Sequence, residues 1–226
     1  MYKKIAASLA VLFQTACTTM PQLDKDILPA PADTACKNEQ IVCRKLTAGE
    51  IKMAKTIFQD SINYKDVRIF LHPYSISRLG APATAPDGKI YIHNPVLWSD
   101  DYASAPLRLQ KTYIHEMTHV WQHQQGRQMV AETAALWLQS PFNYSSQYNY
   151  EFDGRDYLAY SHEQQAKMAE TFFVGTSLLK AADRNSDKVG NLTRDVACKV
   201  LAQHYGVLKD HLPVRLPRRG CETPRP

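Results

Sequence analysis

The chain has 226 residues, of which 44% are apolar and 10% aromatic, so it is expected to fold and is not a disordered chain. Its formal net charge is +5, and it falls by two to +3 if Lys3 and Lys4 are removed with an N-terminal signal, too little to indicate nucleic-acid binding. The length fits one domain with short additions at its ends.

Residues 1–16 predict an export signal. They begin with two lysines, and Ile5–Phe13 form an apolar run that is too short to span a bilayer as a helix. The next residues resemble a bacterial lipoprotein signal, in which a small residue precedes a lipidated Cys17, although Gln14 stands where Leu is commonest. The resemblance implies an exported, periplasm-facing outer-membrane lipoprotein; ordinary cleavage nearby is the alternative.

The rest of the chain divides into three parts by composition. Residues 17–45 begin at the Cys17 that the resemblance implies is lipidated, and prolines among small and charged residues predict that they form a tether. Residues 46–210 carry the periodic apolar patterns of a folded domain. Arginines alternating with prolines at 211–226 predict a solvated basic tail.

The cysteines other than Cys17 are even in number, which predicts disulfides in an oxidising compartment. Three pairings are possible. We favour Cys36 with Cys43, which closes a short loop, and Cys198 with Cys221, which attaches the tail to the last helix. A cysteine metal site is disfavoured because no C-x-x-C spacing occurs.

The first predicted elements are one helix and two strands. A capping-box pattern at Thr47 followed by apolar residues at helical spacing predicts a helix over 48–60. Branched and aromatic residues predict strands at 67–71 and 89–93, the second after a turn at 85–88. His93 in the second strand is interpreted as a structural or surface histidine. With the helices that follow, the pattern predicts an α+β fold, mainly helical, with a small antiparallel sheet.

The helix downstream of this sheet carries the sequence H-E-M-T-H. It is expected to start near residues 104–106 and to stop near Gly126. His115 and His119 are four residues apart, so they share one helix face and can bind one metal ion. Glu116 can then reach a water on that metal as a general base. Two surface histidines are the alternative, which leaves Glu116 unexplained.

Two further polar residues of this helix, Gln122 and His123, have expected roles outside the ligand set. His123 lies eight residues from His115, about 12 Å along a helix, and is excluded as a ligand of the same ion. Gln122 shares a face with His115 and is either a hydrogen-bond partner of the site or part of the core edge.

A catalytic zinc needs a third protein ligand. After a short helix over 130–138 and an extended aromatic segment at 148–152, Ser161 opens a strong helix to about residue 182. The candidates are Glu163 in its first turn, His162 and Glu170. Two other glutamates fit less well: Glu132 and Glu151.

The motifs over residues 89–175 resemble those of the gluzincins, a class of zinc peptidases. H-E-M-T-H-V-W-Q followed by tyrosines and by E-Q-Q-A is similar to short gluzincin-type domains of bacterial secreted and toxin-associated proteins. The resemblance implies a zincin-like fold and a Zn²⁺ ion held by His115, His119 and Glu163. It also implies that the strand at 89–93 is an edge strand that pairs with the substrate.

The function expected from these features is zinc-dependent hydrolysis of amide bonds in a polypeptide or a peptidoglycan peptide at the cell envelope. Glu116 would be the general base, and Tyr157 or Tyr160 would donate to the oxyanion. The alternative is a non-catalytic zinc-binding lipoprotein that serves as a binding or assembly module of a secretion or envelope system. The expected partners are the substrate, a membrane through the lipid anchor, and a protein partner in the alternative. A third interpretation is a peptidase inhibited by residues 148–152 or by the tail.

Overall fold

The computed structural model describes residues 36, 42–74, 81–139, 144–182, 188–217 and 221. The expected signal segment at 1–16 and the expected lipidation site Cys17 lie outside these residues. Within them the protein is α+β and mostly helical, as expected. In the described part of the chain, no helix combines the length and the apolar character needed to cross a membrane.

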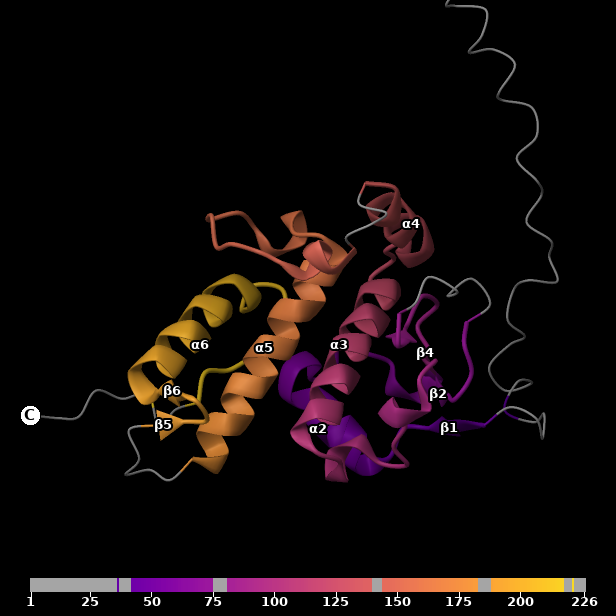
Figure 1. The fold of residues 1–226 in the computed structure, drawn as a ribbon, viewed down its shortest axis with the longest axis horizontal. Helices are drawn as coiled ribbons and strands as arrows, with labels where there is room; N and C mark the ends of the chain where they lie inside the picture. The colour runs from indigo at the N-terminus through magenta and orange to yellow at the C-terminus, as the bar shows by residue number, and fades with distance from the viewer. Residues whose placement is uncertain are drawn as a thin grey trace, which may run out of the picture.

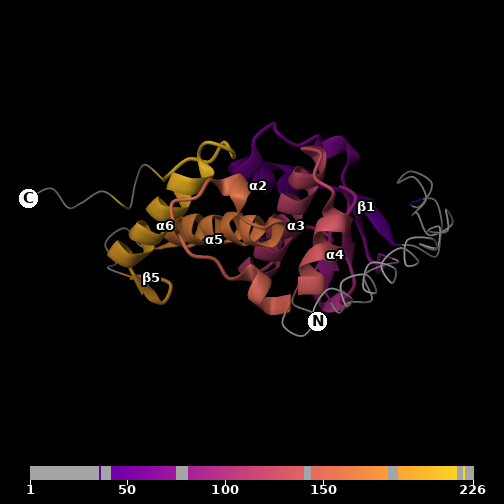
Figure 2. The ribbon, with the colours of Figure 1, turned by 90° about the horizontal axis from the view of Figure 1, so that it is seen from above.

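Two long helices, α3 and α5, pack side by side at the centre of the molecule (Figure 1). The sheet lies on the outer side of α3, and α6 lies on the outer side of α5 (Figure 2). The helices are α2 (Ala48–Phe58), α3 (Leu107–Gln124), α4 (Met129–Gln139), α5 (His162–Ala181) and α6 (Arg194–Leu208). Short 3-10 turns lie between them: η2 (Tyr64–Asp66), η3 (Pro95–Leu97), η4 (Tyr102–Ser104), η5 (Tyr144–Tyr148) and η6 (Tyr157–Ala159).

The main sheet has four strands in the order β1 (Cys43–Lys45), β2 (Arg68–Phe70), β4 (Ile90–Ile92) and β3 (Ala83–Thr84). It is mixed, because β2 and β4 run parallel while the two outer pairs are antiparallel. The expected antiparallel sheet is therefore wrong. The alternation of side chains marks a strand but does not fix its direction, which here follows from the insertion of β3 before β4.

The strand expected at the edge of the sheet lies inside it. β4 is hydrogen-bonded on both sides, and β3 forms the edge instead. His93, just after β4, has a structural role: its Nδ1 lies 2.7 Å from the carbonyl of Ala81 and its Nε2 lies 3.1 Å from Oγ1 of Thr84. These contacts attach the end of β4 to the segment that leads into β3.

Most helix ends lie close to the predicted positions. The capping box of Thr47 is present, with Glu50 closing it from the third helical residue. α2 ends two residues early because Gln59 has a positive φ of 44°. α3 begins at Leu107, directly after the expected start at residues 104–106. Pro106 holds the N-cap position of α3, and residues 102–104 form η4.

Two boundaries of the expected domain are shifted. β1 lies inside the expected tether, where it pairs with β2. The expected tail begins inside the core, since Leu212 and Val214 are only 1% and 6% exposed and the side chain of Gln59 donates to the carbonyl of Pro213. The sequence around Leu212 and Val214 predicted a solvated segment because its apolar residues stand next to prolines. The core that buries them is formed by elements distant in sequence, which a local pattern does not show.

Disulfides attach both ends of the described chain to helices and strands. Cys36 is joined to Cys43 at the start of β1, and Cys198 in α6 is joined to Cys221. These are the two pairs favoured from the sequence. A second, two-stranded sheet of β5 (Lys188–Val189) and β6 (Leu192–Thr193) precedes α6.

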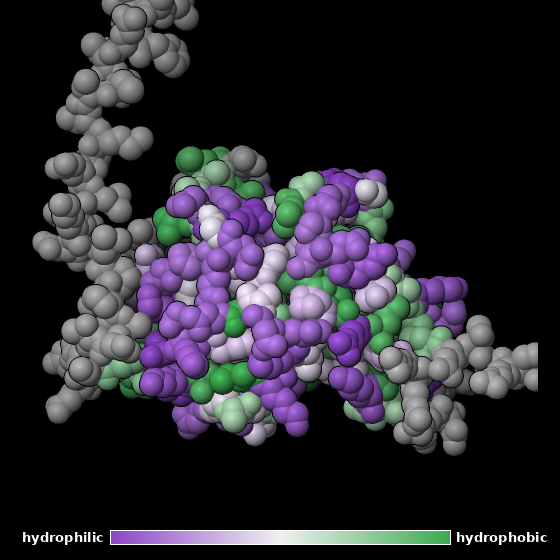
Figure 3. Space-filling model, turned by 180° about the vertical axis from the view of Figure 1, so that it is seen from behind, coloured by the Kyte–Doolittle hydropathy of each residue, from purple (hydrophilic) through white to green (hydrophobic). Residues whose placement is uncertain are grey.

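α4 stands at the top of the molecule and packs against α3 and η5 (Figure 1). Its outer surface is apolar, with Val130 41% and Leu138 73% exposed. Apolar side chains gather accordingly at the upper left of Figure 3, where α4 lies in the reversed view. This helix therefore borders the centre of the molecule without being enclosed by it.

Candidate metal centre

The centre of the molecule holds three side chains from two helices. α3 buries every residue from Tyr113 to Gln122, so the histidines of this stretch lie between α3 and its neighbours rather than in solvent. His115 and His119 point to the same side, as residues four apart on a helix do. Their Nε2 atoms are 3.2 Å apart. The sequence spacing therefore gives the expected pair.

α5 brings a carboxylate to this pair. Its capping box starts the helix at Ser161 and places Glu163 in the first turn. Oε2 of Glu163 lies 3.3 Å from Nε2 of His115 and 3.4 Å from Nε2 of His119. Ala166, fully buried between the helices, lets them approach closely.

The three atoms fit a metal ion by their chemistry. Two imidazole nitrogens and one carboxylate oxygen converge, and each is a common ligand of zinc. In the described part of the chain this is the one group of three acidic, histidine or cysteine side chains close enough to share an ion. Cys36, Cys43, Cys198 and Cys221 cannot serve as thiolate ligands of a metal, because they form disulfides.

The charges of the cluster shift the pKa values of its members. Burial lowers the pKa of His115, but the carboxylates of Glu163 and Glu170 raise it by more, to about 10. Burial raises the pKa of Glu163, while His119 and His115 lower it by more, so that it lies well below its usual range. A divalent cation at this point would replace a proton and satisfy all three atoms at once.

Glu116 is the fourth buried group of the site. Its side chain is adjacent to His115 on α3, and the residue is 5% exposed. One oxygen, Oε2, has no hydrogen-bond partner among the described residues. Burial raises the pKa of Glu116 above its ordinary value, although His115 and His119 act in the opposite direction. A buried carboxylate with a spare oxygen is suited to exchange a proton with a bound water.

His119 has a hydrogen-bond partner on its other ring nitrogen, whereas Nδ1 of His115 has none among the described residues. Nδ1 of His119 lies 2.8 Å from Oε1 of Gln122, whose amide nitrogen donates to the carbonyl of His162 and to Oε1 of Gln165. Gln122 therefore orients a histidine of the site, which is one of the two roles expected for it. It contacts His119 rather than His115, because it lies one turn further along the helix.

The rivals for the third ligand take other positions. Oε2 of Glu170 lies 3.3 Å from Nδ1 of His115, on the side of the ring that faces away from the cluster. Burial raises the pKa of Glu170, while His115 and Lys167 lower it by more, to about 2. Nε2 of His162 lies 3.5 Å from the other oxygen of Glu163 and 3.2 Å from Oγ1 of Thr133.

The remaining glutamates weighed from the sequence lie outside the cluster. Glu132 forms an ion pair with Arg127, and its Oε2 lies 3.7 Å from Nδ1 of His162. Glu151 has an exposed side chain after η5, where its main-chain carbonyl accepts from Tyr160. Neither of the two belongs to the group of three that could hold a metal.

The structure does not bring the two expected oxyanion donors to the cluster. The hydroxyl of Tyr157 donates to the carbonyl of Gln165, and that of Tyr160 donates to the carbonyl of Glu151. Both residues are buried supports of the α5 start. The tyrosine beside the site is Tyr148 of η5, whose ring centre lies 5.7 Å from that of His115. The sequence marked this segment as aromatic but not which ring faces the histidines.

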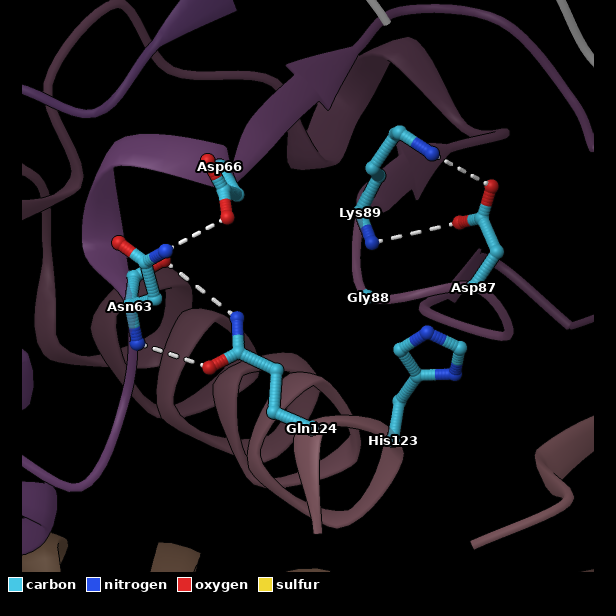
Figure 4. Close-up of a pocket in the computed structure, with 7 residues that line it drawn as sticks. All are labelled: Asn63, Asp66, Asp87, Gly88, Lys89, His123 and Gln124. Atoms are coloured by element: carbon cyan, nitrogen blue, oxygen red, sulfur yellow. Dashed lines mark hydrogen bonds and ion pairs between the residues drawn. The ribbon is translucent and has the colours of Figure 1, made fainter. Parts of the chain in front are cut away.

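His123 lies in a separate surface pocket, as its exclusion from the ligand set predicted. The pocket has a volume of about 420 Å³ and lies between the end of α3, η2 and the turn before β4 (Figure 4). Its lining residues are Asn63, Asp66, Asp87, Gly88, Lys89, His123 and Gln124. Gly88 is needed here, because it has a φ of 78° and a Cβ would lie 2.8 Å from the His123 ring.

Comparison with known proteins gives one relative by sequence and one by structure. No family model matches the chain. Over 150 residues, 66% of this chain, it is 34% identical to the type VI secretion system spike protein VgrG2b of Pseudomonas aeruginosa. The chain spans only 15% of that protein. The solved effector domain of Pseudomonas aeruginosa VgrG2b is also similar, with 34% identity and a TM-score of 0.53 over 59% of this chain and 75% of that one.

These relatives correct the family and the function expected from the motifs. The gluzincin assignment is wrong, since the similarity is to a type VI secretion effector domain; H-E-x-x-H and E-x-x-A are short patterns that do not define a family. The expected zincin-like fold is likewise not confirmed. The expected function, a lipid-anchored zinc peptidase of the cell envelope, is also wrong, because both relatives belong to a type VI secretion system. The alternative, a secretion-system module, is nearer, but its lipoprotein character has no support.

The match covers three quarters of the solved domain at 34% sequence identity, which indicates common descent and not only a similar fold. On this similarity, the chain belongs to the same family as the effector domain of VgrG2b.

Proposed function

We propose that this protein is a type VI secretion effector domain that acts as a zinc-dependent peptidase. The observation that carries the activity is the convergence of His115, His119 and Glu163 within 3.4 Å beside the buried carboxylate of Glu116. The secretion role rests on the family, and its partners would then be components of a type VI secretion apparatus.

The ligand set supports zinc in a catalytic rather than a structural role. Three protein ligands leave a tetrahedral ion one position for water or substrate, whereas structural sites use four protein ligands. The set also contains no thiolate. A bound zinc would supply Lewis-acid chemistry and lower the pKa of water at that open position.

Glu116 is the residue that would move the proton. Its oxygen without a partner can accept a proton from the attacking water and return it to the leaving amine. The raised pKa of Glu116 suits both steps, because a carboxylate that binds its proton too weakly would not carry it. Gln122 holds the ring of His119, so this ligand is oriented before substrate arrives.

The test compares zinc content and peptide hydrolysis in matched variants. Wild type should hold one zinc per chain by elemental mass spectrometry and should release new N-termini from a complex peptide mixture. Glu163→Ala should lose zinc. Glu116→Gln should keep zinc and lose at least about 100-fold in turnover, the lower range for a general base. Glu151→Gln, an exposed acid-to-amide change, is the control for both measurements.

Two results would contradict the proposal. If wild type binds zinc but cleaves no peptide across broad mixtures, the site is not a peptidase. If Glu116→Gln cleaves as fast as wild type, the activity does not belong to this site or does not use this base.

A further inference from the structure

The two histidines of the metal centre have different partners on their outer ring nitrogens. Nδ1 of His119 meets a neutral amide oxygen, that of Gln122, at 2.8 Å. Nδ1 of His115 lies 3.3 Å from a carboxylate oxygen of Glu170, which is an ion-pair distance, and has no hydrogen-bond partner among the described residues. A histidine that offers Nε2 to a metal carries its proton on Nδ1 and needs an acceptor there.

Glu170 is held in place by groups from both helices. It follows Glu163 by two turns on the same face of α5, so it also points towards α3. Its other oxygen, Oε1, lies 2.7 Å from Nζ of Lys167 and 3.6 Å from Nζ of Lys111. Lys111 precedes His115 by one turn on α3. The lysines take one oxygen of Glu170 and leave the other for His115.

We propose that Glu170 is a positioning residue for His115: it accepts from Nδ1, turns Nε2 towards the metal and makes His115 the stronger electron donor of the two histidines. The inference rests on the proposed metal site and adds a residue to it. It also explains why a second buried glutamate lies beside a ligand set that Glu163 already completes. A carboxylate partner makes imidazole a better ligand than an amide partner does.

Zinc affinity tests this role without any use of activity. Glu170→Gln keeps an acceptor oxygen of the same size and removes the charge. In competition with a chromogenic zinc chelator, the dissociation constant for zinc should rise by about 10-fold to 100-fold. Asp195→Asn, which makes the same change in the exposed ion pair of α6, should leave it unchanged.

A spectroscopic signature separates positioning from mere structural support. In zinc-loaded wild type labelled in its histidine rings, the Nδ1 proton of His115 should resonate far downfield because it is bonded to a carboxylate. In Glu170→Gln this signal should move upfield, while that of His119 stays in place. The double variant Lys111→Met and Lys167→Met keeps the carboxylate but frees it, and should weaken zinc binding by a smaller factor.

Glu170→Gln that binds zinc within twofold of wild type would overturn this inference and leave the proposed function intact. If Glu170→Gln does not fold, unchanged zinc affinity in the double lysine variant would overturn it equally. Wild type that binds no zinc would overturn both, so the two failures are distinguishable.

Discussion

At the scale of single residues, the polar atoms of the metal centre cannot all be satisfied by hydrogen bonds to one another. Two imidazole nitrogens and a carboxylate oxygen face one another, and a proton can bridge only one pair of them at a time. The nearby carboxylates raise the pKa of His115, so the cluster favours a positive charge at this position. One oxygen of Glu116 beside them is also without a partner in the described residues. The protein keeps these groups buried, which is costly unless they serve a ligand.

The part of this site that follows from sequence is the part set by local geometry. Helical spacing alone placed His115, His119 and Glu116, and the capping box at Ser161 placed Glu163 in the first turn of the next helix. The roles of Glu170 and Gln122 could not be assigned, because they depend on how α3 crosses α5. Glu170 meets His115 only through that crossing, whereas the contact of Gln122 with His119 is local to α3 and the partners that fix its amide come from the residues at the start of α5.

Tyr157 should contribute to stability and not to catalysis. Tyr157→Phe removes a buried hydroxyl that donates to the carbonyl of Gln165, which should lower the free energy of unfolding by about 1 kcal/mol. Urea unfolding measures this loss, and peptide turnover at saturating zinc should remain that of wild type. A fall in turnover without a loss of stability would return Tyr157 to the set of catalytic residues.

At the scale of elements, the helices were predictable and the sheet was not. The 3.6-residue apolar pattern and the capping boxes are local signals, so α2, α3 and α5 were located within a few residues. The strands of the sheet are two or three residues long, and the β1–β2 and β2–β4 pairs join segments more than 20 residues apart in sequence. For this reason β1 was assigned to the tether, while the edge position of β4 was an expectation from the resemblance alone.

The close approach of α5 and α6 depends on one glycine. A Cβ at Gly175 would lie 2.8 Å from Cδ2 of the buried Leu201, whereas among the described residues nothing lies within 4 Å of a Cβ at Gly206 in α6. Gly206→Ala should therefore stabilise the fold by about 0.5–1 kcal/mol through helix propensity. Gly175→Ala gains the same propensity but must displace Leu201, for a net loss of up to about 2 kcal/mol.

Denaturant midpoints of the two glycine variants, measured side by side, check this contrast. Equal stabilisation by both substitutions would show that Leu201 can move aside and that the helices are not in contact through Gly175.

At the scale of the whole molecule, the fold is a pair of central helices with the sheet on one side and α6 on the other (Figure 2). This arrangement puts the metal centre between α3 and α5, so that ligands 44 or more residues apart in sequence meet. The motifs of the sequence did not identify the family correctly. Its motifs are four or five residues long, whereas the similarity to the VgrG2b effector domain extends over 59% of the chain.

The central claim is that His115, His119 and Glu163 bind one zinc ion. Crystals of the protein grown with zinc, measured on both sides of the zinc absorption edge, test it most directly. We expect a single strong anomalous peak within bonding distance of Nε2 of both histidines and of the Glu163 carboxylate, with Glu170 against Nδ1 of His115. A map without a peak there, or with zinc held by other side chains, would contradict it.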